Sequence, residues 1–182
     1  MTNNKILMVI AHDNFRDEEF LIPKEIFEKN NYIVDVVSDK KGISIGKFGC
    51  QVHVKKSFED INVDEYCCIS ISGGNGSKDY LWNNEPLKNI IIDFNNKNKI
   101  IAAICISPII FAKSNLLKNK RVTFYKKDNE AYKIMKQSFC IIENKNVVVD
   151  GNIITSDGPE SSFDYGNKIV ETLNIFKNKK IL

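Results

Sequence analysis

Cys105 is the residue whose surroundings most suggest chemistry. It follows the apolar run Ile100-Ile101-Ala102-Ala103-Ile104, and Pro108 comes three residues later. Such a run is typical of a buried parallel strand, and proline suits the first turn of a helix because its missing N–H leaves nothing unsatisfied. The pattern predicts a strand-to-helix turn that lifts a reactive thiol above the sheet. A small buried hydrophobe is the alternative interpretation of Cys105.

A second chemical feature is the acidic stretch Asp17-Glu18-Glu19, which opens a predicted helix over residues 17–30. The dipole of a helix favours carboxylates in its first turn, so Glu19 is either an ordinary first-turn residue or an acid/base group. Pro23 lies inside this helix and predicts that the helix is kinked or restarts there.

Alternating strands and helices must position these groups. Strands are predicted over residues 5–11, 33–38, 64–71, 100–104, 121–125, 138–142, 147–150 and 153–156, and helices over 17–30, 86–97, 108–114, 130–135 and from Ser161. Residues 42–55 alternate between apolar and polar and predict a β-hairpin. The fold class is therefore α/β, an open and mainly parallel sheet with helices on both faces and a hairpin excursion, in one domain over residues 1–182.

Three breaks in the chain fall where strands of this sheet end at their carboxyl edge: residues 12–19, residues 72–77 and Cys105. Ligands and reactive groups in open α/β sheets gather at that edge. We expect these three segments to form one site.

Five segments, in this order and spacing, together resemble the ThiJ/PfpI superfamily over nearly the whole chain. They are Asp17-Glu18-Glu19-Phe20-Leu21-Ile22-Pro23, Gly46-Lys47-Phe48-Gly49, Ser72-Gly73-Gly74-Asn75, Ala102-Ala103-Ile104-Cys105 with Pro108, and Asp150-Gly151-Asn152-Ile153-Ile154-Thr155-Ser156. The resemblance implies a flavodoxin-like or class I glutamine amidotransferase-like sandwich.

The resemblance also implies roles for individual residues. Cys105 matches the family nucleophile, Glu19 matches the glutamate beside its sulfur, and the backbone N–H groups of Gly74 and Ile106 match an oxyanion hole. An ionised Glu19 would repel a thiolate, whereas a protonated Glu19 would donate a hydrogen bond to it. We therefore expect a raised pKa for Glu19 and a lowered pKa for Cys105.

Three positions depart from the family pattern and indicate the branch. Proteolytic members carry a histidine directly after the cysteine, where this chain has Ile106, and Lys78 stands where a neighbouring subunit would supply a glutamate. The deglycase-like branch tolerates an apolar residue after the cysteine. Its usual histidine after the next strand is replaced by Tyr125, which can still donate a hydrogen bond.

Several other residues are candidates for the edge of the site or for an interface. Gly73, Asn75 and Tyr125 are expected to line the pocket, and His12 either reaches it or packs against a loop. The family commonly dimerises, so we expect a homodimer through the hairpin at residues 42–55 and the first helix, with His53 at the interface. No cofactor is expected, and neither histidine has metal-ligand spacing.

The composition excludes some classes of protein. The net charge is +3, and no basic patch is interleaved with aromatic residues, so nucleic-acid binding is not expected. No apolar run reaches membrane-spanning length, and no signal segment is visible at the N-terminus. The five cysteines (50, 67, 68, 105 and 140) lack paired spacing. We expect free thiols in a cytoplasmic protein.

Three functions remain open. In the first, which we favour, Cys105 attacks the aldehyde carbon of a small dicarbonyl such as methylglyoxal, or its adduct with protein side chains, with Glu19 as the acid/base. This would be a glyoxalase or deglycase activity. In the second, a redox-sensing or chaperone-like stress protein, Cys105 is oxidised to the sulfinate. The third is a PfpI-type intracellular cysteine protease, which the absence of a histidine after Cys105 disfavours.

Overall fold

The computed structural model describes residues 4–179. Its strands are β1 Lys5–Val9, β2 Asp13–Phe15, β3 Ile33–Ser38, β4 Gly42–Gly46, β5 Gln51–Val54, β6 Lys56–Ser57, β7 Cys68–Ile71, β8 Ile100–Ile104, β9 Arg121–Val122, β10 Ile141–Ile142, β11 Val147–Asp150 and β12 Ile153–Ser156. Its α-helices are α1 Asp17–Lys29, α2 Glu85–Asn96, α3 Pro108–Lys113, α4 Asn129–Gln137 and α5 Ser162–Lys179.

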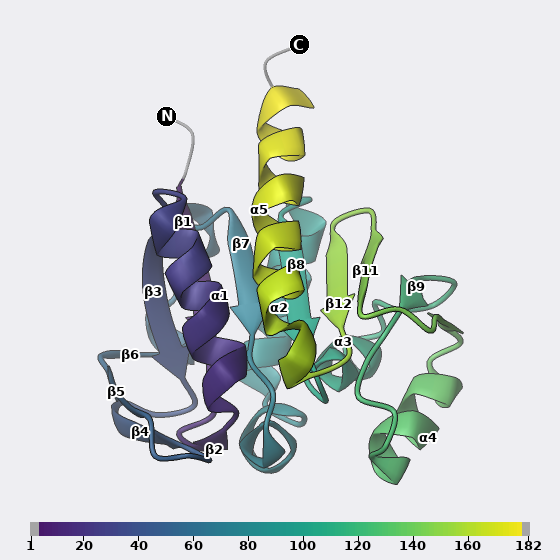
Figure 1. Ribbon diagram of the computed structural model, residues 1–182, viewed down its shortest axis with the longest axis horizontal. Helices are drawn as coiled ribbons and strands as arrows, with labels where there is room; N and C mark the ends of the chain where they lie inside the picture. The colour runs from purple at the N-terminus through teal and green to yellow at the C-terminus, as the bar shows by residue number, and fades with distance from the viewer. Residues whose placement is uncertain (1–3, 180–182) are drawn as a thin grey trace.

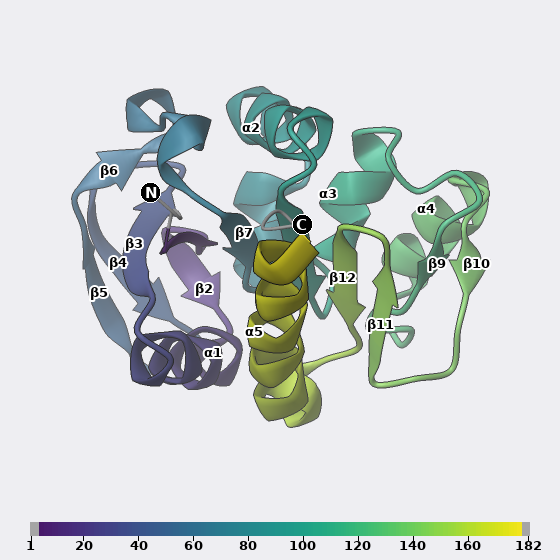
Figure 2. The ribbon, with the colours of Figure 1, turned by 90° about the horizontal axis from the view of Figure 1, so that it is seen from above.

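A seven-stranded sheet in the order β11-β12-β8-β7-β1-β3-β6 forms the centre of the fold (Figure 1). Every neighbouring pair in it is parallel except β11 and β12, which form an antiparallel hairpin. Figure 2 shows α1 and α5 on one face of the sheet and α2 and α3 on the other. The predicted α/β fold with helices on both faces is confirmed.

The central strands β7 and β8 are buried along their whole length, and β1 is buried beyond Lys5. This explains why they are apolar without alternation, since both faces of a parallel strand lie under helices. The hairpin at residues 42–55 is present as β4 and β5, and the short strand β2 joins it beside β4. Residues 12–16, predicted to be a loop, thus contain a strand.

Several predicted elements differ in the structure. The strand predicted over residues 64–71 begins only at Cys68, because Val63–Glu65 forms a short helical turn. The strands predicted over residues 121–125 and 138–142 shrink to β9 and β10, which pair with each other outside the main sheet. Ser77–Leu81, which the sequence left without an element, forms a π-helical turn.

Helix α1 continues through Pro23 without restarting. A proline within a helix leaves the carbonyl four residues earlier without its usual N–H donor. Here that carbonyl belongs to Glu19, and the Ser72 hydroxyl donates to it at 3.1 Å. The proline is thus tolerated, and its orphaned carbonyl ties α1 to the segment after β7.

Gly166 allows α5 to lie close against this part of α1. A Cβ at Gly166 would lie 2.8 Å from Ile26 Cδ1 and 3.1 Å from Pro23 Cα. The two helices therefore pack closely at the middle of α1. Within residues 4–179, no helix is long and apolar enough to cross a membrane.

Candidate functional site

Cys105 occupies a sharp turn between β8 and α3. Its φ is +64°, in the left-handed region that is unusual for a residue with a side chain. The turn is held at both backbone groups, because Cys105 N–H donates to the Ser156 carbonyl at 2.9 Å and Tyr125 N–H donates to the Cys105 carbonyl at 2.8 Å. The residue is only 9% exposed, and it lines a cavity.

Two backbone N–H groups face the Cys105 sulfur, those of Gly74 and Ile106. Gly74 adopts φ +93°, and a Cβ there would lie 2.5 Å from Arg16 N and 2.6 Å from Asn14 O. Only glycine fits this position, which allows the amide to turn toward the sulfur. The two residues that the resemblance assigned to an oxyanion hole therefore do converge on Cys105.

Glu19 lies in the first turn of α1 and is fully buried beside Cys105. Its Oε2 accepts a hydrogen bond from Gly73 N–H at 2.8 Å, while Oε1 is buried without a conventional hydrogen-bond partner. A Cβ at Gly73 would lie 2.6 Å from both Glu19 Oε2 and Cys105 Cβ. Gly73 thus lies beneath the pair and lets the carboxyl and the thiol approach each other.

Burial dominates the electrostatics of this pair. It raises the pKa of Glu19 to about 7, against smaller lowering effects of the Gly73 amide, the Cys105 side chain and Arg16. Burial also raises the pKa of the Cys105 thiol, and the nearby charge of Glu19 raises it further, while the two amides lower it. The raised pKa predicted for Glu19 is confirmed, but the lowered pKa predicted for Cys105 is wrong.

The reversal follows from burial that a single sequence does not reveal. Burial favours the protonated form of the thiol, and it brings the pKa of the carboxyl to about 7. A carboxylate with a pKa near the working pH is well suited to act as a general base. The pair therefore consists of a protonated nucleophile and an adjacent base that can take its proton.

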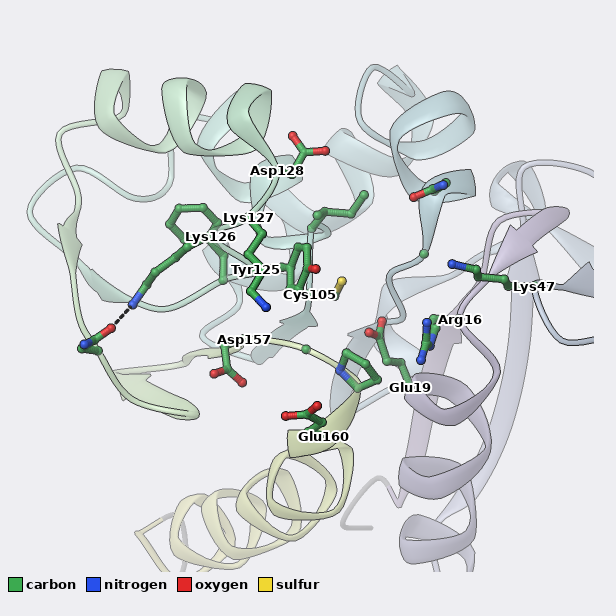
Figure 3. A pocket seen from close by; sticks show the side chains of 17 residues that line it. Arg16, Glu19, Lys47, Cys105, Tyr125, Lys126, Lys127, Asp128, Asp157 and Glu160 are labelled. Carbon is green, nitrogen blue, oxygen red and sulfur yellow. Dashed lines mark hydrogen bonds between the residues drawn. The ribbon is translucent and has the colours of Figure 1, made fainter.

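A cavity of about 550 Å³ opens above Cys105. Figure 3 shows side chains from several parts of the chain converging around the sulfur. Asn75 and Tyr125 line the cavity as predicted, whereas Gly73, also predicted to line it, does not, because it lies against Cys105 and Glu19. The other lining residues are Arg16, Glu19, Lys47, Gly74, Cys105, Ile106, Phe124, Lys126, Lys127, Asp128, Asn144, Asp157, Gly158, Pro159 and Glu160.

His12 does not line this cavity. Its Nδ1 lies 2.5 Å from Asp39 Oδ2, and its ring packs on Tyr80 with the ring centroids 4.0 Å apart. Of the two roles that the sequence left open, the structure shows loop packing. His53 lies exposed on β5, in register with Ile43.

Lys78, which replaces the glutamate of proteolytic family members, is held by an acidic pair. Its Nζ lies 2.6 Å from Glu130 Oε2 and 3.6 Å from Asp128 Oδ2. The side chain is therefore already paired within this chain. Among the described residues no group of histidine, cysteine or acidic side chains has the arrangement of a metal site.

The charged walls of the cavity were missed by sequence reasoning. Most of them come from the loops after β9 and β12, where only Tyr125 and the Asp157-Gly158-Pro159 break gave a signal, and Arg16 and Lys47 add positive charge from the segments before α1 and after β4. Lys126 is fixed in place, because its Nζ donates to the Glu143 carbonyl and to Asn144 Oδ1, both at 2.7 Å. The cavity thus presents both charge signs to a ligand.

Comparison with known proteins identifies the family. The model of the DJ-1/PfpI family matches residues 4–172. The chain belongs to the DJ-1/PfpI family. It is 44% identical to an uncharacterized protein of Methanocaldococcus jannaschii over 95% of this chain and 84% of that protein. It is also 28% identical to a protein of Pyrococcus abyssi named a deglycase, over 92% of this chain and 98% of that protein.

The solved structures agree with this assignment. A ThiJ/PfpI domain protein from Brachyspira murdochii matches with a TM-score of 0.90 and 32% identity, covering 96% of this chain and 98% of that one. DJ-1/PfpI membership fits the arrangement of a cysteine elbow, a buried glutamate and a glycine-rich loop.

Proposed function

We propose that the protein is a cysteine-dependent enzyme that acts on reactive dicarbonyls or on the adducts that they form with amines and thiols. The observation that supports this most strongly is the set of groups around one sulfur atom. Cys105 is faced by the Gly74 and Ile106 amides, has the Glu19 carboxyl beside it, and opens into a cavity of about 550 Å³. A nucleophile, a base and an oxyanion site are the parts that carbonyl addition requires.

The first step follows from this arrangement. As the Cys105 sulfur bonds to the aldehyde carbon of methylglyoxal, Glu19 takes the thiol proton. The carbon–oxygen π bond breaks, and its electron pair moves onto the oxygen, which the N–H groups of Gly74 and Ile106 stabilise. Glu19 then returns the proton to that oxygen, which gives a neutral thiohemiacetal.

The following steps need no external oxidant. Glu19 moves the proton of the former aldehyde carbon to the neighbouring carbonyl carbon by way of an enediol, so that one carbon is oxidised and the other reduced. The product is a lactoyl thioester on Cys105. Water hydrolyses this thioester, which releases lactate and restores the thiol. With an amine adduct as substrate, the sulfur bonds to the carbinol carbon as its carbon–nitrogen bond breaks, and Glu19 passes the thiol proton to the leaving nitrogen. The repaired amine is released, and the same thiohemiacetal remains on Cys105.

The second candidate, a redox-sensing or chaperone-like protein, has one specific observation in its favour. Glu19 Oε1 lacks a conventional hydrogen-bond partner, and in its protonated form it could donate to an oxygen added to the Cys105 sulfur. Two equivalents of a peroxide would convert the thiol to the sulfinic acid, releasing two of water or alcohol. The raised thiol pKa opposes this route, since the thiolate is the form that reacts with peroxide.

A PfpI-type protease receives less support than either. Ile106 follows the nucleophile and offers no base, and Lys78 is engaged by Glu130.

Lactate formation from methylglyoxal tests the proposal. We expect turnover in the wild type, none above background in Cys105→Ala, and a large loss in Glu19→Gln. Cys140→Ala and Glu28→Gln serve as matched controls, because these residues lie outside the cavity, and both should keep the wild-type rate. Stoichiometric oxidation of Cys105 by peroxide without any lactate would instead support the redox candidate.

We also propose that the protein works as a homodimer through the β4–β5 hairpin and α1. Large apolar side chains are exposed on these elements: Leu21 at 47%, Ile43 at 62%, Ile45 at 44% and Phe48 at 62%. Light scattering should give twice the chain mass for the wild type and a smaller mass for Ile43→Glu. All five cysteines are free, which suits the reducing cytoplasm that we propose as its location.

A further inference from the structure

Two buried serines are hydrogen-bonded to the segment after β7 that contributes to the site. Ser107 follows Ile106 at the start of α3, and Ser77 begins the π-helical turn; both are fully buried. Their hydroxyl oxygens are 2.7 Å apart, and the Ser107 hydroxyl donates to the Ser72 carbonyl at 2.7 Å. Neither side chain lines the cavity, so neither can touch a substrate.

The direction of these hydrogen bonds is determined by counting hydrogens. A serine hydroxyl has one hydrogen, and that of Ser107 is used on the Ser72 carbonyl. Ser77 must therefore donate to Ser107. The hydrogen bonds run in one direction, from Ser77 through Ser107 to the carbonyl of Ser72.

The carbonyl at the end of this chain belongs to the peptide unit that joins Ser72 to Gly73. The N–H of the same unit donates to Glu19 Oε2 at 2.8 Å. A peptide whose oxygen accepts a strong hydrogen bond becomes more polarised, and its N–H becomes a better donor. Every donor in the series Ser77, Ser107, peptide thus points toward the Glu19 carboxyl.

We propose that Ser107 and Ser77 are positioning residues that favour the carboxylate form of Glu19 through the Ser72–Gly73 peptide. The chain of donors stabilises negative charge on Oε2 and opposes the desolvation that favours the neutral acid. It thereby keeps the base available near neutral pH. The inference rests on the proposed function only where it calls Glu19 the base. The effect of the serines on the protonation of Glu19 does not depend on that function.

Other groups also act on Glu19 and must be held constant. Cys105 faces it from the turn after β8, Arg16 and Glu18 lie at the start of α1, and Tyr165 approaches from α5. None of these side chains contributes to the Ser77–Ser107–Ser72 hydrogen bonds. Substitution of either serine therefore changes the donor chain and leaves the facing charges in place.

The test is a titration of the Glu19 carboxyl carbon by NMR in protein labelled at glutamate, with the signal assigned through Glu19→Gln. We expect the midpoint in Ser107→Ala to move upward by about 0.1 to 0.7 pH units. This follows from cooperative strengthening of about 10–30% per bond in a charge-assisted hydrogen bond. Ser77→Ala keeps the bond from Ser107 to the peptide, so its shift should be upward and smaller.

Ser114→Ala is the matched control. Ser114 is also buried and directly follows α3, but its hydroxyl donates to the Ile110 carbonyl at 2.8 Å and is not part of the hydrogen bonds that lead to Glu19. Its midpoint should equal that of the wild type. If Ser107→Ala does not fold, the Glu19 midpoint is measured in Ser77→Ala and Ser107→Gly instead.

An unchanged or lowered midpoint in the serine variants would overturn the proposal, as would an equal shift in Ser114→Ala. Because the titration needs no substrate, its outcome is independent of lactate formation. If the protein makes no lactate but the Glu19 midpoint shifts upward in both serine variants, the proposed function is refuted and the proposed role of Ser77 and Ser107 is supported. If the protein makes lactate but the midpoints do not shift, the proposed function is supported and the proposed role of the serines is refuted.

Discussion

Replacing Gly73 by alanine should damage the site far more than the fold. The new Cβ would lie 2.6 Å from Cys105 Cβ, 2.6 Å from Glu19 Oε2 and 3.0 Å from the Ile104 carbonyl oxygen. A new carbon atom needs about 3.5 Å to its non-bonded neighbours, so Cys105 and Glu19 must each move away from it by close to 1 Å. Overpacking of this extent costs about 1–3 kcal/mol of stability. A displacement near 1 Å of reacting groups costs about 100-fold in rate.

The assay is kcat/KM for methylglyoxal, measured well below the unfolding temperature of each variant. Gly151→Ala is the control, because Gly151 has φ +65° and only Lys120 Nζ lies near a new Cβ, at 3.9 Å. It should lose about 1–2 kcal/mol of stability from the left-handed backbone and keep full activity. Wild-type kcat/KM in Gly73→Ala would refute the close approach of Cys105 and Glu19 across Gly73.

Two further predictions concern stability. Burial raises the pKa of Glu19 from 4.5 to about 7, so the folded state binds its proton more tightly than the unfolded state does. Stability should therefore fall by about 3 kcal/mol as pH rises from 4.5 to 7, and urea unfolding of Glu19→Gln should lack this fall. Asp17 accepts hydrogen bonds from Phe48 N–H at 2.9 Å and Cys50 N–H at 2.8 Å, and it ties the β4–β5 turn to α1. Asp17→Ala should lower the free energy of unfolding in urea by about 2–3 kcal/mol. Glu28→Ala, which removes an exposed ion pair, should lower it by under about 1 kcal/mol. Equal losses in the two variants would contradict the role of Asp17.

The main sheet could be predicted from the sequence because its strands are continuously apolar. The bounds of β3, β11 and β12 are those expected, and the run before Cys105 ends where β8 ends. Local patterns also place the helices to within a few residues. These strands are predictable because helices cover both faces of a parallel sheet, so that consecutive residues of a strand are all apolar.

The remainder of the fold depends on tertiary contacts. The strand β2 exists because it pairs with β4, and β9 and β10 are each two residues long and exist as a pair. The π-helical turn at Ser77–Leu81 carries no periodic apolar signal. Short segments of this kind have no pattern of their own to predict them.

Some parts of the site could likewise be predicted from the sequence, and others could not. The order of Glu19, Gly74 and Cys105 along the chain, together with the resemblance, was enough to bring them together. The direction in which the pKa of the Cys105 thiol is shifted could not be predicted, because it depends on how completely the turn is buried. The cavity walls at Lys126 and Asp157 come from loops whose positions are set by the fold and not by local sequence.

The most direct test of the proposed catalytic pair is the pH dependence of kcat/KM for methylglyoxal in the wild type and in Glu19→Gln. If Glu19 is the base that takes the proton of Cys105, wild-type kcat/KM rises with pH through a midpoint near 7, and the rise is absent in Glu19→Gln. A rise with the same midpoint in both proteins, or a wild-type profile that follows a free thiol near pH ~8.5, would contradict that role for Glu19.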